Sequence, residues 1–112
     1  MDREDKWVVP FIQMASEEAG EDLQIMCAPW SPPAFMKNNN DMNHGGRLLR
    51  KYYKAWAKYM VKYVKGMLER GVDIELLSVQ NEPEAKQDWA SCKFDATEEA
   101  MLAVDYIYEE LK

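Results

Sequence analysis

The sequence contains little histidine and little cysteine, and this limits the chemistry it can support. His44 is the only histidine, and the two cysteines, Cys27 and Cys92, lie far apart. Protein zinc sites need several such ligands at short spacing, so a metal site is not expected. Two cysteines allow one disulfide bond, whose formation the sequence leaves open, and they exclude a disulfide framework.

The sequence also lacks long apolar runs and an excess of positive charge. No apolar run approaches the roughly 20 residues of a membrane-spanning helix. The charged segment 1–6 is not followed by the apolar stretch of a signal peptide, and the compartment of the protein stays open. With 14 Lys and Arg against 20 Asp and Glu, the net charge is −6. A chain this acidic is not expected to bind nucleic acid or an anionic membrane through its bulk charge.

What is present is a globular composition, with 47% apolar and 12% aromatic residues, in a length that suits one small domain. Apolar periodicity and turn residues predict five elements. They are a helix over 3–19, a strand over 23–28, a helix over 51–70, a strand over 74–80 and a helix after Asp95. Pro10 is unfavourable inside a helix, so the first helix could begin at Val9 or Pro10.

The alternation of helices and strands predicts an α/β fold with parallel strands. Two parallel strands do not make a finished sheet, so we expect further strands beside them. Asp95 followed by Glu98 predicts a capping box at the start of the last helix. The stripe expected to be buried in that helix is Met101, Val104, Ile107, Tyr108 and Leu111.

Ligands of parallel α/β folds bind at the carboxyl ends of the strands, and candidate site residues follow both predicted strands. Asn81 and Glu82 follow the second strand, and Glu84 is the local competitor of Glu82. A glycosidase needs one carboxylic acid to protonate the leaving oxygen and a second carboxylate across the sugar. A glutamate held at a strand end by a following proline suits the acid. On residue types alone, a solvated glutamate in a turn is the more common case.

Aromatic residues follow the first predicted strand. Trp30 could stack on a sugar ring, with a core tryptophan as the alternative. Phe35 could line the rim of a site or pack within its loop. We expect Trp7, Trp56 and Trp89 to be core residues and His44 to be a surface loop residue. The methionines on apolar stripes are expected to fill the core: Met14, Met60, Met67 and Met101.

Several separated motifs closely resemble those of glycoside hydrolase family 30, the family of glucosylceramidases and endo-β-1,6-glucanases. The resemblance covers essentially the whole chain. Its motifs, in the family's order, are Ala28–Lys37 (APWSPPAFMK), Asn39–Asn43 (NNDMN), Leu77–Glu84 (LSVQNEPE) and Trp89–Cys92 (WASC).

This resemblance implies a (β/α)8 barrel with an attached β-sandwich. Residues 1–112 are then expected to be part of that catalytic domain, a partial barrel carrying strands three and four. The resemblance makes Glu82 the general acid/base, places Asn81 on the sugar 2-hydroxyl, and places Trp30 in the subsite of the cleaved sugar. Phe35 stands where many relatives carry tryptophan and is expected on the aglycone side. The family's nucleophile follows strand seven and lies outside this chain. No cofactor is implied.

The implied function is that of a retaining β-glycosidase acting on β-glucosidic bonds of glucosylceramide-like lipids or β-1,6-glucan. The wording of the motifs is closer to the glucosylceramidase-like and glucanase members than to the xylanases. The alternative is that the 112-residue chain alone, without the remainder of the barrel, is inactive. It would then at most bind carbohydrate weakly or self-associate through its unpaired strands.

Overall fold

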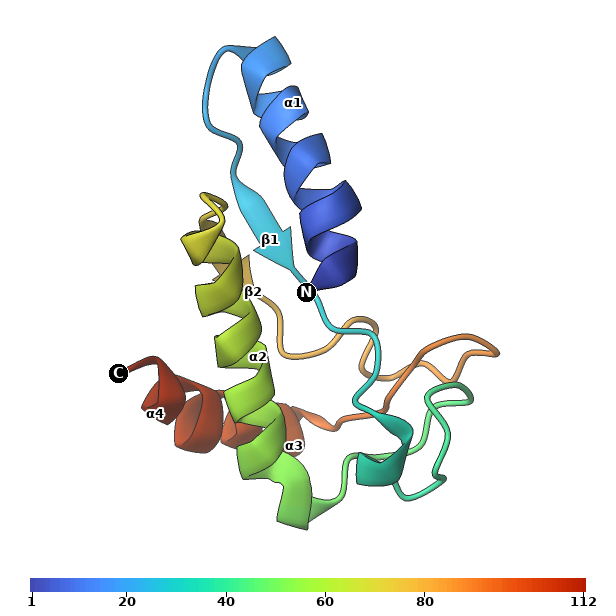
Figure 1. Ribbon diagram of the computed structural model, residues 1–112. Helices are drawn as coiled ribbons and strands as arrows, with labels where there is room; N and C mark the ends of the chain where they lie inside the picture. Colours follow the sequence, from blue (N-terminus) through green and yellow to red (C-terminus); the bar gives the residue numbers. More distant parts are fainter. The chain divides into compact units, whose positions relative to one another are not determined.

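The computed structural model describes all residues, 1–112, and the chain forms two compact units. The first unit contains residues 1–27 and 63–77, and the second contains residues 28–62 and 78–112. Helix α2, Tyr53–Glu69, contributes its first half to the second unit and its second half to the first. The order of helices and strands along the chain is the predicted one (Figure 1).

The first unit contains a two-stranded parallel sheet, which confirms the predicted α/β class. Strand β1, Ile25–Cys27, pairs with β2, Ile74–Leu77. Ile25 lies opposite Ile74 and Cys27 opposite Leu77, with an irregularity in the register after Ile25. Both strands are shorter than predicted. Two paired strands leave two open sheet edges, which is the condition under which strands recruit further partners.

Helix α1, Val9–Ala19, packs on this sheet, and a turn of π-helix, Glu4–Val8, precedes it. Pro10 follows this turn and lies inside a helical stretch that is continuous over residues 2–19. A proline in a helix removes one backbone hydrogen bond, and the change from π to α spacing falls directly before Pro10. Gly20 ends the helix in the left-handed conformation, with φ of 72°.

The core of the first unit is small and aliphatic. Val9, Met67, Val72 and Ile74 are buried, and residues such as Ile12 and Ile25 pack against them. Trp7 and Met14, by contrast, are more than 60% exposed, so the expectation that they are core residues is wrong. They share the outer stripe of the first helical segment with Phe11, while the neighbouring Val8, Val9 and Ile12 meet the sheet side.

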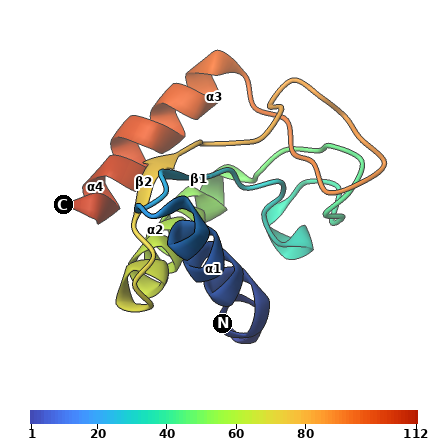
Figure 2. The ribbon, with the colours of Figure 1, turned by 90° about the horizontal axis from the view of Figure 1, so that it is seen from above.

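The second unit holds the first half of α2 and the C-terminal helical segment. That segment comprises α3, Ala96–Met101, a π-helical stretch, Leu102–Ile107, and α4, Tyr108–Leu111. The predicted capping box is present, because the Asp95 carboxylate accepts from the Glu98 N–H at 2.8 Å and the Glu98 carboxylate accepts from the Asp95 N–H at 3.0 Å. Figure 2 shows the segment running on as one helix.

The buried face of that segment differs from the predicted stripe. Ile107 is buried as predicted, and Leu102, which is not in the predicted stripe, is buried as well. Val104, Tyr108 and Leu111 are exposed. Leu102 and Ile107 bound the π-helical stretch, and its five-residue hydrogen-bond spacing accounts for a buried pair that lies five residues apart. On α2, Trp56 and Met60 are buried as expected. No helix in the structure has the length and apolar character to cross a membrane.

Both cysteines are free thiols, and Cys92 is buried whereas Cys27 is half-buried. Burial raises the pKa of Cys92 to about 11, and it raises the pKa of Cys27 as well. The thiolate is the reacting species, so at pH 8 Cys92 should alkylate on the order of a hundredfold more slowly than an ordinary thiol. Mass spectrometry after an iodoacetamide pulse measures this. Labelling of native Cys92 as fast as in urea would contradict the burial.

Candidate functional site

The segments that follow β1 and β2 in the chain meet within the second unit. The Asn81 N–H donates to the Pro29 carbonyl at 2.9 Å. These residues belong to the two motifs that follow the strands, which were expected to lie on one rim. The structure therefore brings the Trp30 and Glu82 segments together.

Gln80 adds a second connection between the same segments. Its side-chain Nε2 donates to the Trp30 carbonyl at 2.9 Å and to the Asn81 carbonyl at 3.1 Å. The side chain is buried, and its Oε1 has no hydrogen-bond partner. Two neutral hydrogen bonds stabilise by about 0.5–1.5 kcal/mol each, whereas an unsatisfied buried acceptor costs about 1–3 kcal/mol. The net effect of Gln80 on stability is therefore small, and its main effect is to orient two carbonyl groups.

Glu82 is exposed and has an unusual backbone conformation. Its φ is 45°, in the left-handed region that non-glycine residues rarely adopt. Two backbone hydrogen bonds hold the turn that contains Glu82. The Ala85 N–H donates to the Glu82 carbonyl at 2.9 Å, and the Phe94 N–H donates to the Pro83 carbonyl at 2.9 Å. Strained residues of this kind persist where their surroundings fix them, and they concentrate at functional sites.

The other predicted site residues are accessible in the second unit. Trp30 is 50% exposed, so it is not a core residue. Asn81 is half-buried, and its side-chain amide makes no hydrogen bond within the chain. Phe35 is 60% exposed and meets the Tyr52 ring edge-on at 5.6 Å between centroids. Trp89 is also half-exposed, and the expectation that it is a core residue is wrong.

Lys37 connects the two long loops of the second unit, 29–49 and 81–95. Its side chain is only 2% exposed, although it carries a charge. The Lys37 Nζ donates to the Ser91 carbonyl at 2.6 Å and to the Met42 carbonyl at 3.1 Å. Burial lowers the pKa of Lys37, and the nearby Asp41 carboxylate opposes that effect. No local sequence signal distinguishes this lysine from a surface lysine.

Ser91 extends the connection toward Glu82. Its Oγ accepts from the Gly45 N–H at 2.9 Å and from the Gln87 N–H at 3.2 Å. The Gln87 Nε2 in turn donates to the Glu82 carboxylate at 3.4 Å. A continuous set of contacts thus runs from Lys37 to Glu82, and the two loops lie side by side in Figures 1 and 2.

His44 sits at the surface end of these loops, as expected. Its side chain is 52% exposed and pairs with the Asp41 carboxylate at 2.8 Å. Its backbone N–H donates to the Gln87 carbonyl at 2.7 Å. His44 therefore helps to shape the loop through its backbone.

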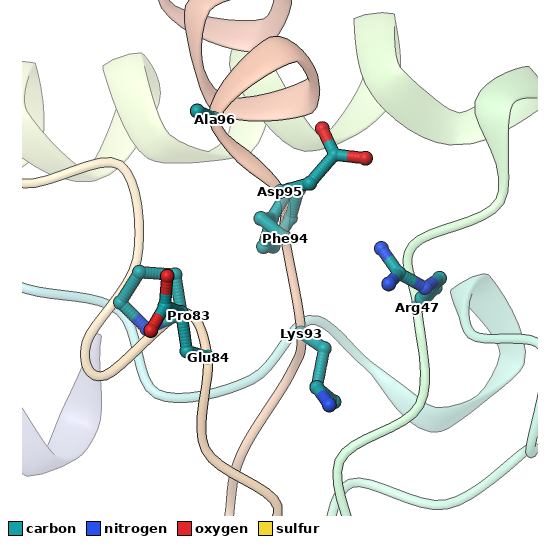
Figure 3. A pocket seen from close by; sticks show the side chains of 7 residues that line it. All are labelled: Arg47, Pro83, Glu84, Lys93, Phe94, Asp95 and Ala96. Atoms are coloured by element: carbon teal, nitrogen blue, oxygen red, sulfur yellow. The ribbon is translucent and has the colours of Figure 1, made fainter.

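Two hollows border the Glu82–Pro83–Glu84 turn. One, of about 380 Å³, is lined by Glu82 itself together with Phe94 and Glu99. Burial and the Glu84 charge raise the pKa of Glu99. The other, of about 230 Å³, lies between Arg47, Asp95 and the Pro83–Glu84 pair (Figure 3). Both hollows combine carboxylates with apolar walls.

Comparison with known proteins assigns the family. Residues 1–111 match the glycosyl hydrolase family 30 TIM-barrel domain. The chain belongs to glycoside hydrolase family 30. The resemblance drawn from its motifs is therefore confirmed, and its two parallel strands and their helices are part of a family 30 (β/α)8 barrel.

Individual relatives agree with this assignment. A protein named as a glucosylceramidase in Caenorhabditis elegans is 36% identical over 102 residues, covering 84% of this chain and 20% of the relative. Endo-1,6-β-D-glucanase BGN16.3 of Trichoderma harzianum is 31% identical over 103 residues, covering 81% of this chain and 21% of the relative. The chain thus spans about a fifth of the length of these curated relatives.

A solved structure supports the fold directly. SrfJ from Salmonella typhimurium superposes with a TM-score of 0.92 at 41% sequence identity, covering 98% of this chain and 24% of that protein. At this identity and coverage, almost the whole chain has a structural counterpart within a longer protein. This relative is therefore a suitable scaffold for experiments that need the whole barrel.

Replacing Lys37 by methionine should loosen the contact between the two loops. The change keeps the apolar stem and removes the charged donor, whose hydrogen bonds contribute about 1.5–3 kcal/mol. Amide hydrogen exchange at Ser91 and Lys93, which donate to Met42 and Gly46, should therefore accelerate by roughly 10- to 100-fold. The exposed Lys58→Met is the matched control. Unchanged exchange at Ser91 and Lys93 would contradict the role of Lys37.

Proposed function

We propose that Glu82 is the general acid/base of a retaining β-glycosidase. In the first step Glu82, protonated, gives its proton to the departing glycosidic oxygen while a second carboxylate attacks the anomeric carbon. In the second step the Glu82 carboxylate removes a proton from water, which releases the sugar with retained configuration.

The conformation of Glu82 carries this proposal. It is the one carboxylate of the chain with left-handed backbone geometry, and it lies in the Leu77–Glu84 motif that carries the resemblance to the family. The Gln87 amide reaches its carboxylate, and the 380 Å³ hollow beside it leaves room for a leaving group. Glu84 also lines that hollow, but it lies beyond Pro83 and lacks the strained backbone.

The neighbouring residues take the roles of substrate contacts. The unpaired Asn81 amide hydrogen-bonds the sugar 2-hydroxyl, a contact that strengthens in the transition state. Trp30, tied to Asn81 through Gln80, offers a half-exposed ring for the cleaved sugar. Phe35, exposed and braced by Tyr52, lies on the aglycone side.

The substrate class is β-glucosidic, with glucosylceramide-like lipids or β-1,6-glucan as the candidates. Relatives named as glucosylceramidase and as endo-1,6-glucanase support these two. The shared chemistry is cleavage of a β-glycosidic bond, and the two differ in the aglycone.

The 112-residue chain alone is inactive under this proposal. It holds two strands, and the family resemblance implies that the nucleophile follows a later strand of the barrel. The chain alone would at most bind carbohydrate weakly, or associate through its two open sheet edges.

A completed barrel tests the role of Glu82. Residues 1–112 would replace the matching segment of the Salmonella relative, and the unaltered relative would be assayed alongside. Glu82→Gln should lower kcat/KM on an alkyl β-glucoside by roughly 10²- to 10⁴-fold, because protonation of the leaving oxygen is lost. The first step on a dinitrophenyl β-glucoside should survive, because that leaving group needs no proton.

Glu84→Gln is the matched control for this experiment, since it alters the neighbouring exposed carboxylate. It should leave the pattern of leaving-group dependence unchanged. Equal losses on both substrates for Glu82→Gln, or no loss on either, would refute the assignment, as would an inactive completed barrel beside an active relative.

A further inference from the structure

Gln80 has a geometry that the roles of Glu82, Asn81 and Trp30 do not explain. It directly precedes the site residues, yet its side chain is 3% exposed and cannot reach a substrate at the surface. Both hydrogens of its Nε2 are used, one on the Trp30 carbonyl and one on the Asn81 carbonyl. These are the backbone carbonyls of the two residues proposed above as contacts of the sugar.

We infer that Gln80 is a positioning residue, which fixes the position of Trp30 relative to the peptide group between Asn81 and Glu82. This inference rests on the proposed function of Glu82. The Asn81 carbonyl belongs to the peptide group that leads into Glu82. The hydrogen bond to that carbonyl fixes the plane of the peptide group between Asn81 and Glu82. The left-handed conformation of Glu82, with φ of 45°, begins at this peptide group.

The orientation of the amide is determined by its partners. If the amide were turned over, its oxygen would face two carbonyl oxygens, with no donor between them. In the observed orientation Oε1 is buried and without a partner. A side chain that leaves an acceptor unsatisfied is a poor choice for stability alone. An apolar residue of similar size would fill the same space without that penalty.

The hydrogen bond from the Asn81 N–H to the Pro29 carbonyl does not replace Gln80. It joins the same segments one residue away, at 2.9 Å, and does not involve the Trp30 or the Asn81 carbonyl. The Gln80 amide holds the planes of these carbonyls. Its loss should therefore disturb orientation at the site more than it disturbs the fold.

Gln80→Glu in the completed barrel tests the inference. The new carboxylate cannot donate, so at neutral pH kcat on the alkyl β-glucoside should fall by roughly tenfold to a hundredfold, the scale of a misplacement near 1 Å. At acidic pH the protonated carboxyl donates one hydrogen bond, and part of the loss should be recovered. The pH–activity profile should therefore move to lower pH relative to the unaltered barrel.

Two further variants separate positioning from folding. Gln80→Met removes both donors at every pH, so its loss should persist at acidic pH even where the folded fraction matches the unaltered barrel. Gln13→Glu makes the same chemical change at an exposed position and should leave the profile in place. If Gln80→Glu keeps the original pH profile while Glu82→Gln remains inactive on the alkyl substrate, the inference about Gln80 fails alone. If Glu82→Gln is active there, the proposed function itself fails.

Discussion

The junction between the Pro29–Trp30 and Gln80–Asn81 segments is the constraint on which the site depends. Two hydrogen bonds cross it, from the Asn81 N–H to the Pro29 carbonyl and from the Gln80 amide to the Trp30 carbonyl. Without them, Trp30 and Glu82 would lie on loops that no hydrogen bond joins at this junction. Catalytic groups are effective largely because the fold fixes their geometry. The entropic cost of aligning them is then met when the protein folds, and the reaction step does not include it.

The long loops beyond that junction support it from the other side. Their contact rests on a buried lysine that donates to two carbonyls and on a serine hydroxyl shared by several backbone groups. Burying a charged lysine is costly unless its donors are satisfied. The Lys37 donors meet backbone carbonyls from both loops, so the loops must close correctly before the charge is satisfied. Gln87 connects this loop contact to Glu82, because its N–H donates to the Ser91 hydroxyl and its side-chain amide donates to the Glu82 carboxylate.

Much of this arrangement follows from the sequence, and the remainder depends on contacts between distant residues. Local patterns in the sequence predict three features correctly. These are the alternation of helices and strands, the Asp95 capping box and the position of Glu82 after a strand. The Gln80 bridge and the Lys37 contacts join residues about fifty positions apart, and neither has a local signal. The buried face of the last helix is predicted only in part, because a stripe drawn at α-helical spacing does not include Leu102, which lies five residues before Ile107 across a π-helical stretch. Trp7 and Trp89 are predicted as core residues, but the structure places Trp7 on the outer side of its helix and Trp89 on an exposed part of its loop.

Chemical rescue tests the central claim, that Glu82 is the acid/base, most directly. A barrel completed with these residues and carrying Glu82→Ala would be given a dinitrophenyl β-glucoside, which forms the glycosyl intermediate without acid help. Azide needs no general base, so it should enter the space left by the side chain and restore turnover. The account predicts a β-glucosyl azide product, with retained configuration. Turnover that azide does not restore, or an α-glucosyl azide, would contradict it.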